Sequence, residues 1–286
     1  MTSTYAPKRD EALFRLEGDF LIPGVLCRGP WYEGSLHGSA MLAAIARGAE
    51  NHPTDVPRQV VRLTVDMMRA APMAPLRVET STVRAGKSID FVDISLYTDD
   101  ELWVRGTALR VRLTDLQVDN NQAAERCPVP PSGTDIAAPP FMRPGADEPA
   151  FHHAIDIHID PMDEMVWFRL AVPVVEGETN SGFLAAATLA DWTYSVPNLL
   201  RSTQESPTVD EERTVFAINA DTTLNMFRPM SGPWLGMNTD SHIGVLGAGV
   251  ANAHLYDENG VLGFASQSIL VRGPSGAPLS VREVSG

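Results

Sequence analysis

Residues 61–72 read VRLTVDMMRAAP, and residues 219–230 read NADTTLNMFRPM. Both stretches alternate small polar residues with apolar ones, place a Met shortly before an Arg, and carry a Pro close to that Arg. The two arginines, Arg69 and Arg228, are 159 positions apart. Because alternation with a period of two indicates a half-buried β-strand, the chain contains one strand pattern twice.

The same spacing continues beyond these two stretches. Tyr97 and Tyr256 are also 159 positions apart, and Arg112 and Arg272 are 160 positions apart. In each copy an alternating segment is followed by a turn sequence, TDDE or YDENG, and then by a second alternating segment. The Asn-Gly pair in the second turn is a strong hairpin signal. We therefore expect duplicated structure, with several antiparallel strands in each copy.

A helix is expected ahead of each set of strands. Residues 36–50, LHGSAMLAAIARGAE, are Ala-rich and apolar on nearly every face, which predicts a buried helix. The Gly-Ser pair beginning at Gly38 is suited to capping its start and to approaching a ligand closely. Residues 181–200, SGFLAAATLADWTYSVPNLL, are similar in length and Ala content. We expect Ser181 to cap this second helix and Pro197 to limit its C-terminal end.

The chain divides into two repeats separated by a linker. The first repeat is expected over residues 10–116 and the second over residues 151–275. Residues 117–150 contain the run CPVPPSGTDIAAPPFMRPGADEP, with seven of the chain's 22 prolines, and predict a semi-extended linker. The predicted fold class is α+β, in which each repeat wraps a curved antiparallel sheet around its own helix.

Composition excludes several classes of function. The 286 residues carry a net charge of −14, which argues against binding to nucleic acid. No apolar run approaches the about 20 residues that cross a bilayer, and the start MTSTYAPKRDEALF has no features of a secretory signal. Neither Cys27 nor Cys127 lies in a CxxC motif or beside a cluster of histidines, so we expect buried thiols rather than a structural zinc site. These features predict a cytoplasmic protein without a metal or cofactor.

Four segments together resemble a known family. They are GPWYEGSLHGSAMLAAIARGAE, LTVDMMRAAPMAPLRVETSTVRAGKSI, NADTTLNMFRPMSGPWLGM and FASQSILVR. Their order and spacing are similar to those of TesB-like acyl-CoA thioesterases with a tandem, or double, hotdog fold, over roughly residues 15–115 and 160–273. The resemblance implies hydrolysis of an acyl-CoA thioester to a free carboxylic acid and CoA. Acyl carrier protein is an alternative carrier, and association into a homo-oligomer is expected.

The family also implies a trio of residues that activates water. It consists of an Asp on the second central helix, a Thr on the next strand and a Gln on the last strand. Asp191 matches the Asp and Gln267 the Gln, whereas the Thr position, counted back from the Arg-Pro pair, holds Asn219. An Asn side chain can also hold a water molecule. Independently, Gln267 shares its strand face with apolar neighbours, which predicts that it points inward.

Further residues are expected near the thioester. Backbone N–H groups at a helix N-terminus can stabilise the developing oxyanion, and Gly38 or Gly182 is placed to supply one. His37, at the entrance of the first helix, is a third candidate substrate-binding residue. Asp221 is a second-line candidate because it lies two positions from Asn219 on the same strand face.

Two other functions remain open from the residues. Hydratases and dehydratases of this fold pair an acid with a His, and Glu33 with His37 is a near match to their motif. Alternatively, the Asn at the Thr position is consistent with a degenerate protein that binds acyl thioesters without hydrolysing them.

A cluster of histidines also requires an interpretation. In FHHAIDIHID, alternation would place His152, Asp156, His158 and Asp160 on one strand face, with His153 beside them. Side chains two apart on a strand are about 7 Å apart, too far for several of them to bind one ion. The polar face of an edge strand is therefore the preferred interpretation over a metal site.

Overall fold

The computed structural model describes residues 11–30, 32–115, 128–132, 148–203, 216–244 and 246–272. Most of the predicted linker, residues 117–150, and Cys127 lie outside the described residues.

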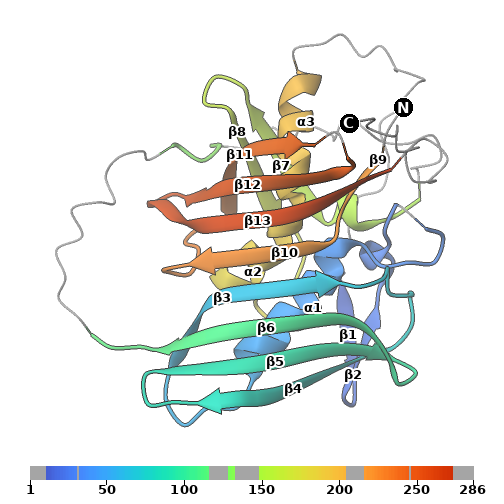
Figure 1. Cartoon of the computed structure of the whole chain (residues 1–286), viewed down its shortest axis with the longest axis vertical. Coiled ribbons are helices and arrows are strands. Elements are labelled where there is room, and N and C mark those ends of the chain that lie inside the picture. Colours follow the sequence, from blue (N-terminus) through green and yellow to red (C-terminus); the bar gives the residue numbers. More distant parts are fainter. Residues whose placement is uncertain are drawn as a thin grey trace, which may run out of the picture.

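Within the described residues, 13 strands form a single antiparallel sheet (Figure 1). The strands of the first half are β1 (Phe14–Glu17), β2 (Phe20–Pro23), β3 (Arg58–Met67), β4 (Leu76–Ala85), β5 (Ile89–Thr98) and β6 (Glu101–Arg112). Those of the second half are β7 (Ile155–Asp160), β8 (Met165–Leu170), β9 (Phe216–Asn219), β10 (Asp221–Met226), β11 (Trp234–Ile243), β12 (Ala248–Asp257) and β13 (Gly260–Arg272). Their order across the sheet is β1-β2-β4-β5-β6-β3-β10-β13-β12-β11-β8-β7, and β9 pairs with β13.

The register of the sheet repeats between the two halves. Val92 on β5 pairs with Ala108 on β6, and Ala251 on β12 pairs with Gln267 on β13, 159 positions later. The predicted hairpin turns lie between these strand pairs, at Asp99–Asp100 and before Gly260. The internal repeat read from the sequence is therefore present as repeated strand pairing.

The two stretches that revealed the repeat lie side by side at the centre of the sheet. They form β3 and the β9–β10 segment, and β3 pairs with β10 in antiparallel register, Thr64 opposite Thr223 (Figure 1). The Thr223 hydroxyl donates a hydrogen bond to the Thr64 hydroxyl at 3.1 Å. This central pairing joins the two halves into one sheet.

The first predicted helix forms as expected but is capped differently. Helix α1 (Gly38–Asn51) is preceded by His37, whose Nδ1 accepts a hydrogen bond from the Ser39 N–H at 3.1 Å. The N-cap is therefore His37 rather than the Gly-Ser pair. A single-turn 3₁₀ helix, η1 (Val25–Cys27), precedes α1 in the chain, and it contacts a second one, η2 (Phe151–His153).

The second predicted helix is divided into three pieces: α2 (Gly182–Leu189), the 3₁₀ helix η3 (Ala190–Ser195) and α3 (Val196–Ser202). Ser181 caps α2 as predicted, because its Oγ accepts a hydrogen bond from the Leu184 N–H at 2.9 Å. Pro197 was expected to limit the helix, but it lies in the first turn of α3. Proline has no N–H to donate to the preceding turn, so it favours a break before itself and a new helix start.

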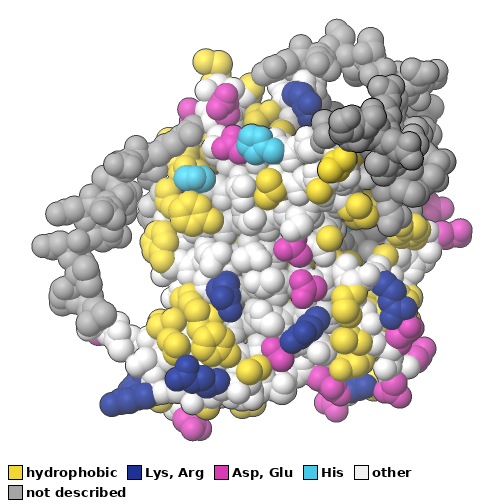
Figure 2. All heavy atoms as spheres, viewed as in Figure 1, with side chains coloured by type: hydrophobic (Ala, Val, Ile, Leu, Met, Phe, Trp, Pro, Cys, Tyr) yellow, Lys and Arg dark blue, Asp and Glu magenta, His cyan; other side chains and the backbone are white. Residues whose placement is uncertain are grey.

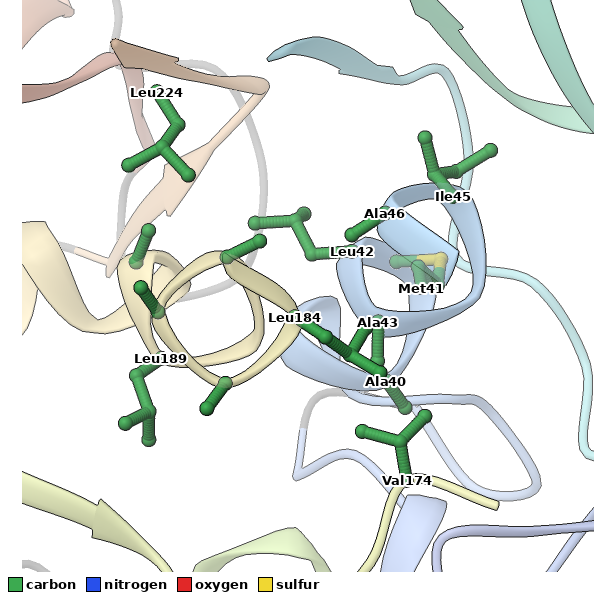
Figure 3. Packing of buried hydrophobic residues seen from close by; sticks show 14 of the residues in the cluster. Ala40, Met41, Leu42, Ala43, Ile45, Ala46, Val174, Leu184, Leu189 and Leu224 are labelled. Carbon is green, nitrogen blue, oxygen red and sulfur yellow. The ribbon is translucent and has the colours of Figure 1, made fainter. Parts of the chain in front are cut away.

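Helices α1 and α2 lie side by side on one face of the sheet, and Figure 3 views them end on. Ala40, Ala43 and Leu42 of α1 face α2, from which Leu184 points into the same interface. Small Ala side chains allow the two helices to approach closely, while each fully buried Leu contributes about 1.5–3 kcal/mol. Helix α1 packs against β3–β6, whereas η3 contacts β10–β13. The core therefore continues through both halves.

The other face of the sheet is largely polar with scattered apolar side chains (Figure 2). Exposed apolar residues on it include Phe264 and Leu270 of β13.

No helix in the described part of the chain is long and apolar enough to cross a membrane. Cys27 is a buried thiol as predicted, and burial raises its pKa well above the ordinary value.

The histidine cluster differs from the predicted strand. His152 and His153 belong to η2, and β7 begins only at Ile155, so His152 does not share a strand face with His158. The edge position of β7 is confirmed. Asp156 on this strand is buried and pairs with Arg169 of β8. Among the described residues no group of three or more His, Cys, Asp or Glu side chains could hold a metal ion.

Candidate active site

Asp191 is the centre of the candidate site. It lies in the first turn of η3 directly after α2, and the residue is only 9% exposed. Its carboxylate accepts a hydrogen bond from Asn219 Nδ2 to Oδ1 at 2.8 Å and one from Ser39 Oγ to Oδ2 at 3.1 Å. His37 Nδ1 lies 3.3 Å from Oδ2. Residues from both halves of the chain therefore surround one carboxylate.

Gly38 makes room for this carboxylate at the start of α1. A Cβ at position 38 would lie 2.5 Å from Oδ1 and 2.6 Å from Oδ2 of Asp191, closer than side-chain atoms can approach. The N-terminus of a helix carries a partial positive charge, which stabilises a nearby anion. A glycine at this position therefore lets an ionised Asp191 lie against the positive end of α1.

The surroundings of Asp191 favour its ionised form. Burial raises its pKa, but hydrogen bonding to His37, the charge of His37, and the hydrogen bonds from Asn219 and Ser39 lower it further than burial raises it. The net result is a pKa below the ordinary value for Asp. The carboxylate is therefore available at neutral pH as a proton acceptor.

Asn219 reaches Asp191 from the strand that the sequence predicted. It is the last residue of β9 and pairs with Ile269 of β13. The chain bends at Ala220 before β10 begins. Asp221, beyond the bend, accepts a hydrogen bond from the Ser268 N–H at 2.6 Å. The bend thus separates the environments of Asn219 and Asp221.

Gln267 supports the turn that carries Asp191. It points inward as predicted and is fully buried, together with its neighbours Ala265, Ile269 and Val271 on the same strand face. Its Nε2 donates to the backbone oxygen of Asp191 at 3.0 Å, and its Oε1 accepts from the Tyr194 N–H at 2.9 Å. The amide therefore binds the backbone of η3 rather than the Asp191 carboxylate.

Thr222 completes the environment of Gln267, and the sequence did not single it out. It is 1% exposed on β10, and its hydroxyl accepts a hydrogen bond from Gln267 Nε2 at 3.0 Å. The inward-facing position of a Thr between apolar neighbours is the signal that could have identified it. Buried hydroxyl groups need a partner, and here the partner is the amide of Gln267.

His37 is held by aromatic rings as well as by hydrogen bonds. Its imidazole stacks against Phe151, with ring centroids 4.6 Å apart, and against Trp192, with centroids 5.6 Å apart. The two rings come from η2 and η3, on the far side of the linker in sequence. Sequence inspection did not identify Phe151 or Trp192 as part of the site, because their proximity depends on packing between the halves.

Two other candidate residues lie elsewhere. Gly182 is at the opposite end of α2 from Asp191, about 14 Å away along a helix that rises about 1.5 Å per residue. A Cβ at position 182 would collide with the backbone oxygen of Met230. Glu33 is exposed in the loop before α1, while His37 lies against Asp191.

Comparisons with known proteins identify the family. A model of the acyl-CoA thioesterase N-terminal domain matches residues 27–111, and one of the acyl-CoA thioesterase C-terminal domain matches residues 124–271. Among curated protein sequences, none matches the chain closely enough to count as a relative.

Solved structures share the fold over nearly the whole chain. The acyl-CoA thioesterase II TesB2 of Mycobacterium marinum is 18% identical, with a TM-score of 0.61 over 92% of this chain and 95% of that one. A hot dog fold protein of Alicyclobacillus acidocaldarius is 17% identical, with a TM-score of 0.62 over 91% of this chain and 95% of that one. The fold is thus a hotdog fold, and the two domain matches together show that the chain belongs to the acyl-CoA thioesterase family.

Proposed function

We propose that the chain is a tandem hotdog enzyme, with repeats at residues 10–116 and 151–275, that hydrolyses acyl-CoA at the site centred on Asp191. The observation that carries this proposal is the buried, ionised Asp191 carboxylate at the N-terminus of α1. A carboxylate in this position can orient a water molecule and accept its proton. The oxyanion that forms on the thioester carbonyl oxygen is then stabilised by the backbone N–H of Gly38 at the start of α1.

The remaining residues have distinct roles in this proposal. Asn219 holds Asp191 by its amide N–H and presents its own oxygen toward the water. Gln267 positions the η3 backbone, and so fixes where the Asp191 carboxylate lies. Attack of the water forms the carbon–oxygen bond, and collapse of the intermediate breaks the carbon–sulfur bond to release CoA.

We further propose one such site per chain. With the 159-position offset between the repeats, Val60 of the first repeat corresponds to Asn219, and Ala108 corresponds to Gln267. Both Val60 and Ala108 are buried apolar residues. Aligning the starts of α1 and α2 relates Asp191 to Arg47, which is paired with Glu178 at 2.9 and 2.6 Å. The first repeat therefore has no Asp, Asn or Gln at the positions that correspond to Asp191, Asn219 and Gln267. A titration with an acyl-CoA should give one bound ligand per chain.

The test is thiol release from a panel of acyl-CoA esters, from short to long and including an aryl ester, by the wild type and by Asp191→Asn. We expect turnover by the wild type and a loss of at least about 100-fold in the variant, the usual effect of removing a general base. Asp240→Asn, which changes an exposed carboxylate on β11, is the control for the loss of a carboxylate elsewhere. Turnover that does not depend on Asp191 would refute the site.

A second function is favoured by one observation. Both oxygens of Asp191 already accept hydrogen bonds, and its side chain is only 6% exposed, which also suits a protein that binds acyl thioesters without hydrolysing them. In that case an acyl-CoA ester would raise the melting temperature without any release of thiol. Turnover of any ester in the panel rules this function out.

A further inference from the structure

His37 Nδ1 has two neighbours with opposite requirements. The Ser39 N–H donates to it at 3.1 Å, which requires a lone pair on Nδ1. The Asp191 Oδ2 atom lies 3.3 Å away, and an interaction with this carboxylate requires a proton on Nδ1. One atom cannot satisfy both at the same time. The geometry therefore fits an imidazole whose Nδ1 gains and loses a proton beside Asp191.

The ring is fixed in the orientation that such a transfer needs. Phe151 and Trp192 stack against it with interplanar angles of 15° and 18°. In the described part of the chain no residue hydrogen-bonds Nε2, and the side chain is 15% exposed. One edge of the imidazole thus faces the buried carboxylate, while its other nitrogen is left for a molecule that enters the site.

We propose that His37 is a catalytic proton relay between Asp191 and the departing thiolate. This inference rests on the proposed function, because it concerns the fate of the proton that Asp191 removes from water. From the sequence, His37 was a candidate substrate-binding residue and, together with Glu33, a near match to the acid–His pair of hydratases.

The proton balance of the relay is complete. The relay starts from the neutral form of His37, with its proton on Nε2 and with Nδ1 accepting from Ser39. In this form the Asp191 carboxylate keeps the hydrogen bonds from Asn219 and Ser39, but it lacks the part of its pKa lowering that a charged His37 supplies. Asp191 takes a proton from water as the carbon–oxygen bond forms, and passes it to Nδ1. When the carbon–sulfur bond breaks, the Nε2 proton goes to the thiolate sulfur and gives the free thiol. The ring is then neutral again with its proton on Nδ1, facing Asp191, and exchange with solvent restores the starting tautomer.

The charges around His37 are compatible with this role. Asp191 is the anion that faces Nδ1, and His152, which interacts with His37, also interacts with His153 and Arg28. Burial, followed by repulsion from His153, His37 and Arg28, lowers the pKa of His152 to about 4. His152 is therefore neutral at neutral pH and adds no second positive charge beside the relay.

The test compares two leaving groups on one acyl group. The acyl group that the wild type hydrolyses fastest is presented as its CoA ester and as its 4-nitrothiophenyl ester. An alkyl thiolate is a stronger base than a nitro-substituted aryl thiolate, so only the CoA ester should need a proton at sulfur. A residue with a merely structural role would affect both esters alike.

Two variants separate the relay from the other roles of His37. His37→Asn keeps an N-cap for α1 but loses the stacked ring. His37→Phe keeps a ring between Phe151 and Trp192 but loses the cap. We expect kcat/KM for the CoA ester to fall about 100-fold in both variants. For the aryl thioester we expect a change of no more than about threefold.

Other outcomes would overturn the relay. Equal losses on both esters would show a structural role, no loss would show that the imidazole is dispensable, and a loss in one variant only would assign the effect to capping or stacking. Asp191→Asn, measured on the same two esters, tests the proposed function separately. If it abolishes turnover of both esters while the His37 variants do not discriminate, the relay fails and the site stands. If it remains active, both proposals fail.

Discussion

The carboxylate of Asp191 occupies the space that a side chain at position 38 would fill. A Cβ on Gly38 would lie 2.8 Å from Asp191 Cγ, although the two residues belong to different halves of the chain. This contact brings the buried anion to the positive end of α1, and it makes the site sensitive to a single methyl group.

Gly38→Ala should therefore displace the Asp191 carboxylate. We expect a loss of about 1–3 kcal/mol in the free energy of unfolding, the usual cost of overpacking, and a fall in kcat of at least about tenfold. Denaturant unfolding and steady-state kinetics measure the two effects. In an Asp191→Ala background the same change should cost little stability, because the colliding carboxylate is absent. Equal costs in both backgrounds would contradict this contact.

Asn219→Asp should inactivate the site through charge. The variant places a second carboxylate where Asn219 Nδ2 now donates to Asp191 Oδ1 at 2.8 Å. Two carboxylates at this separation cannot both ionise easily, so the pKa of the pair rises. If the ionised form is the base, the acid limb of kcat moves to higher pH, and kcat at neutral pH falls about 100-fold.

The pH dependence of kcat between about pH 5 and pH 9 checks this prediction. Asn219→Thr, which restores the residue type that the family implies and keeps a hydrogen-bond donor, is the control and should retain most of the activity. An acid limb that does not move in Asn219→Asp would show that the two side chains do not interact.

Gln267→Met should destabilise the fold and the site together. Methionine has a similar volume but no hydrogen-bonding amide, so the Tyr194 N–H and the Asp191 backbone oxygen lose their partner in a fully buried position. Each such group costs about 1–3 kcal/mol, so for the two groups we expect a loss of about 2–6 kcal/mol. Thermal and denaturant unfolding measure it. Ser268→Met, on the exposed face of the same strand, should change stability by less than about 0.5 kcal/mol.

His152 should make the protein less stable in mild acid. Burial is the main reason that its pKa is lowered to about 4, so between about pH 6.5 and pH 4 the unfolded chain binds a proton that the folded chain does not. Stability contributed by neutral His152 is therefore lost as pH falls through this range.

We expect this loss to amount to about 1–2 kcal/mol, since the ring is partly exposed and solvent screens it. His152→Phe should reduce the slope of unfolding free energy against pH over the same interval. Denaturant unfolding at several pH values measures the slope, and an unchanged slope would show that His152 is not the group responsible.

Local sequence patterns predicted many parts of the molecule correctly. Period-two alternation located the strands, the Asn-Gly pair located a hairpin, and the apolar neighbours of Gln267 showed that it points inward. These features depend on residues close in sequence or on one strand face. The division of the second helix was missed, because the break depends on Pro197 and on hydrogen bonds from Gln267, which lies about 70 positions away.

By itself, the sequence determined the internal repeat and the strands that carry it, and its resemblance to a known family named Asp191, Asn219 and Gln267 as candidate residues. Only the tertiary structure decided that His37, Gly38 and Ser39 of the first half complete the site, and that Gly182 does not. The physical reason is that α1 packs against α2 with small side chains in between, which brings the start of α1 to the turn after α2. Contacts across about 150 positions arise from that packing, and no local periodicity records them.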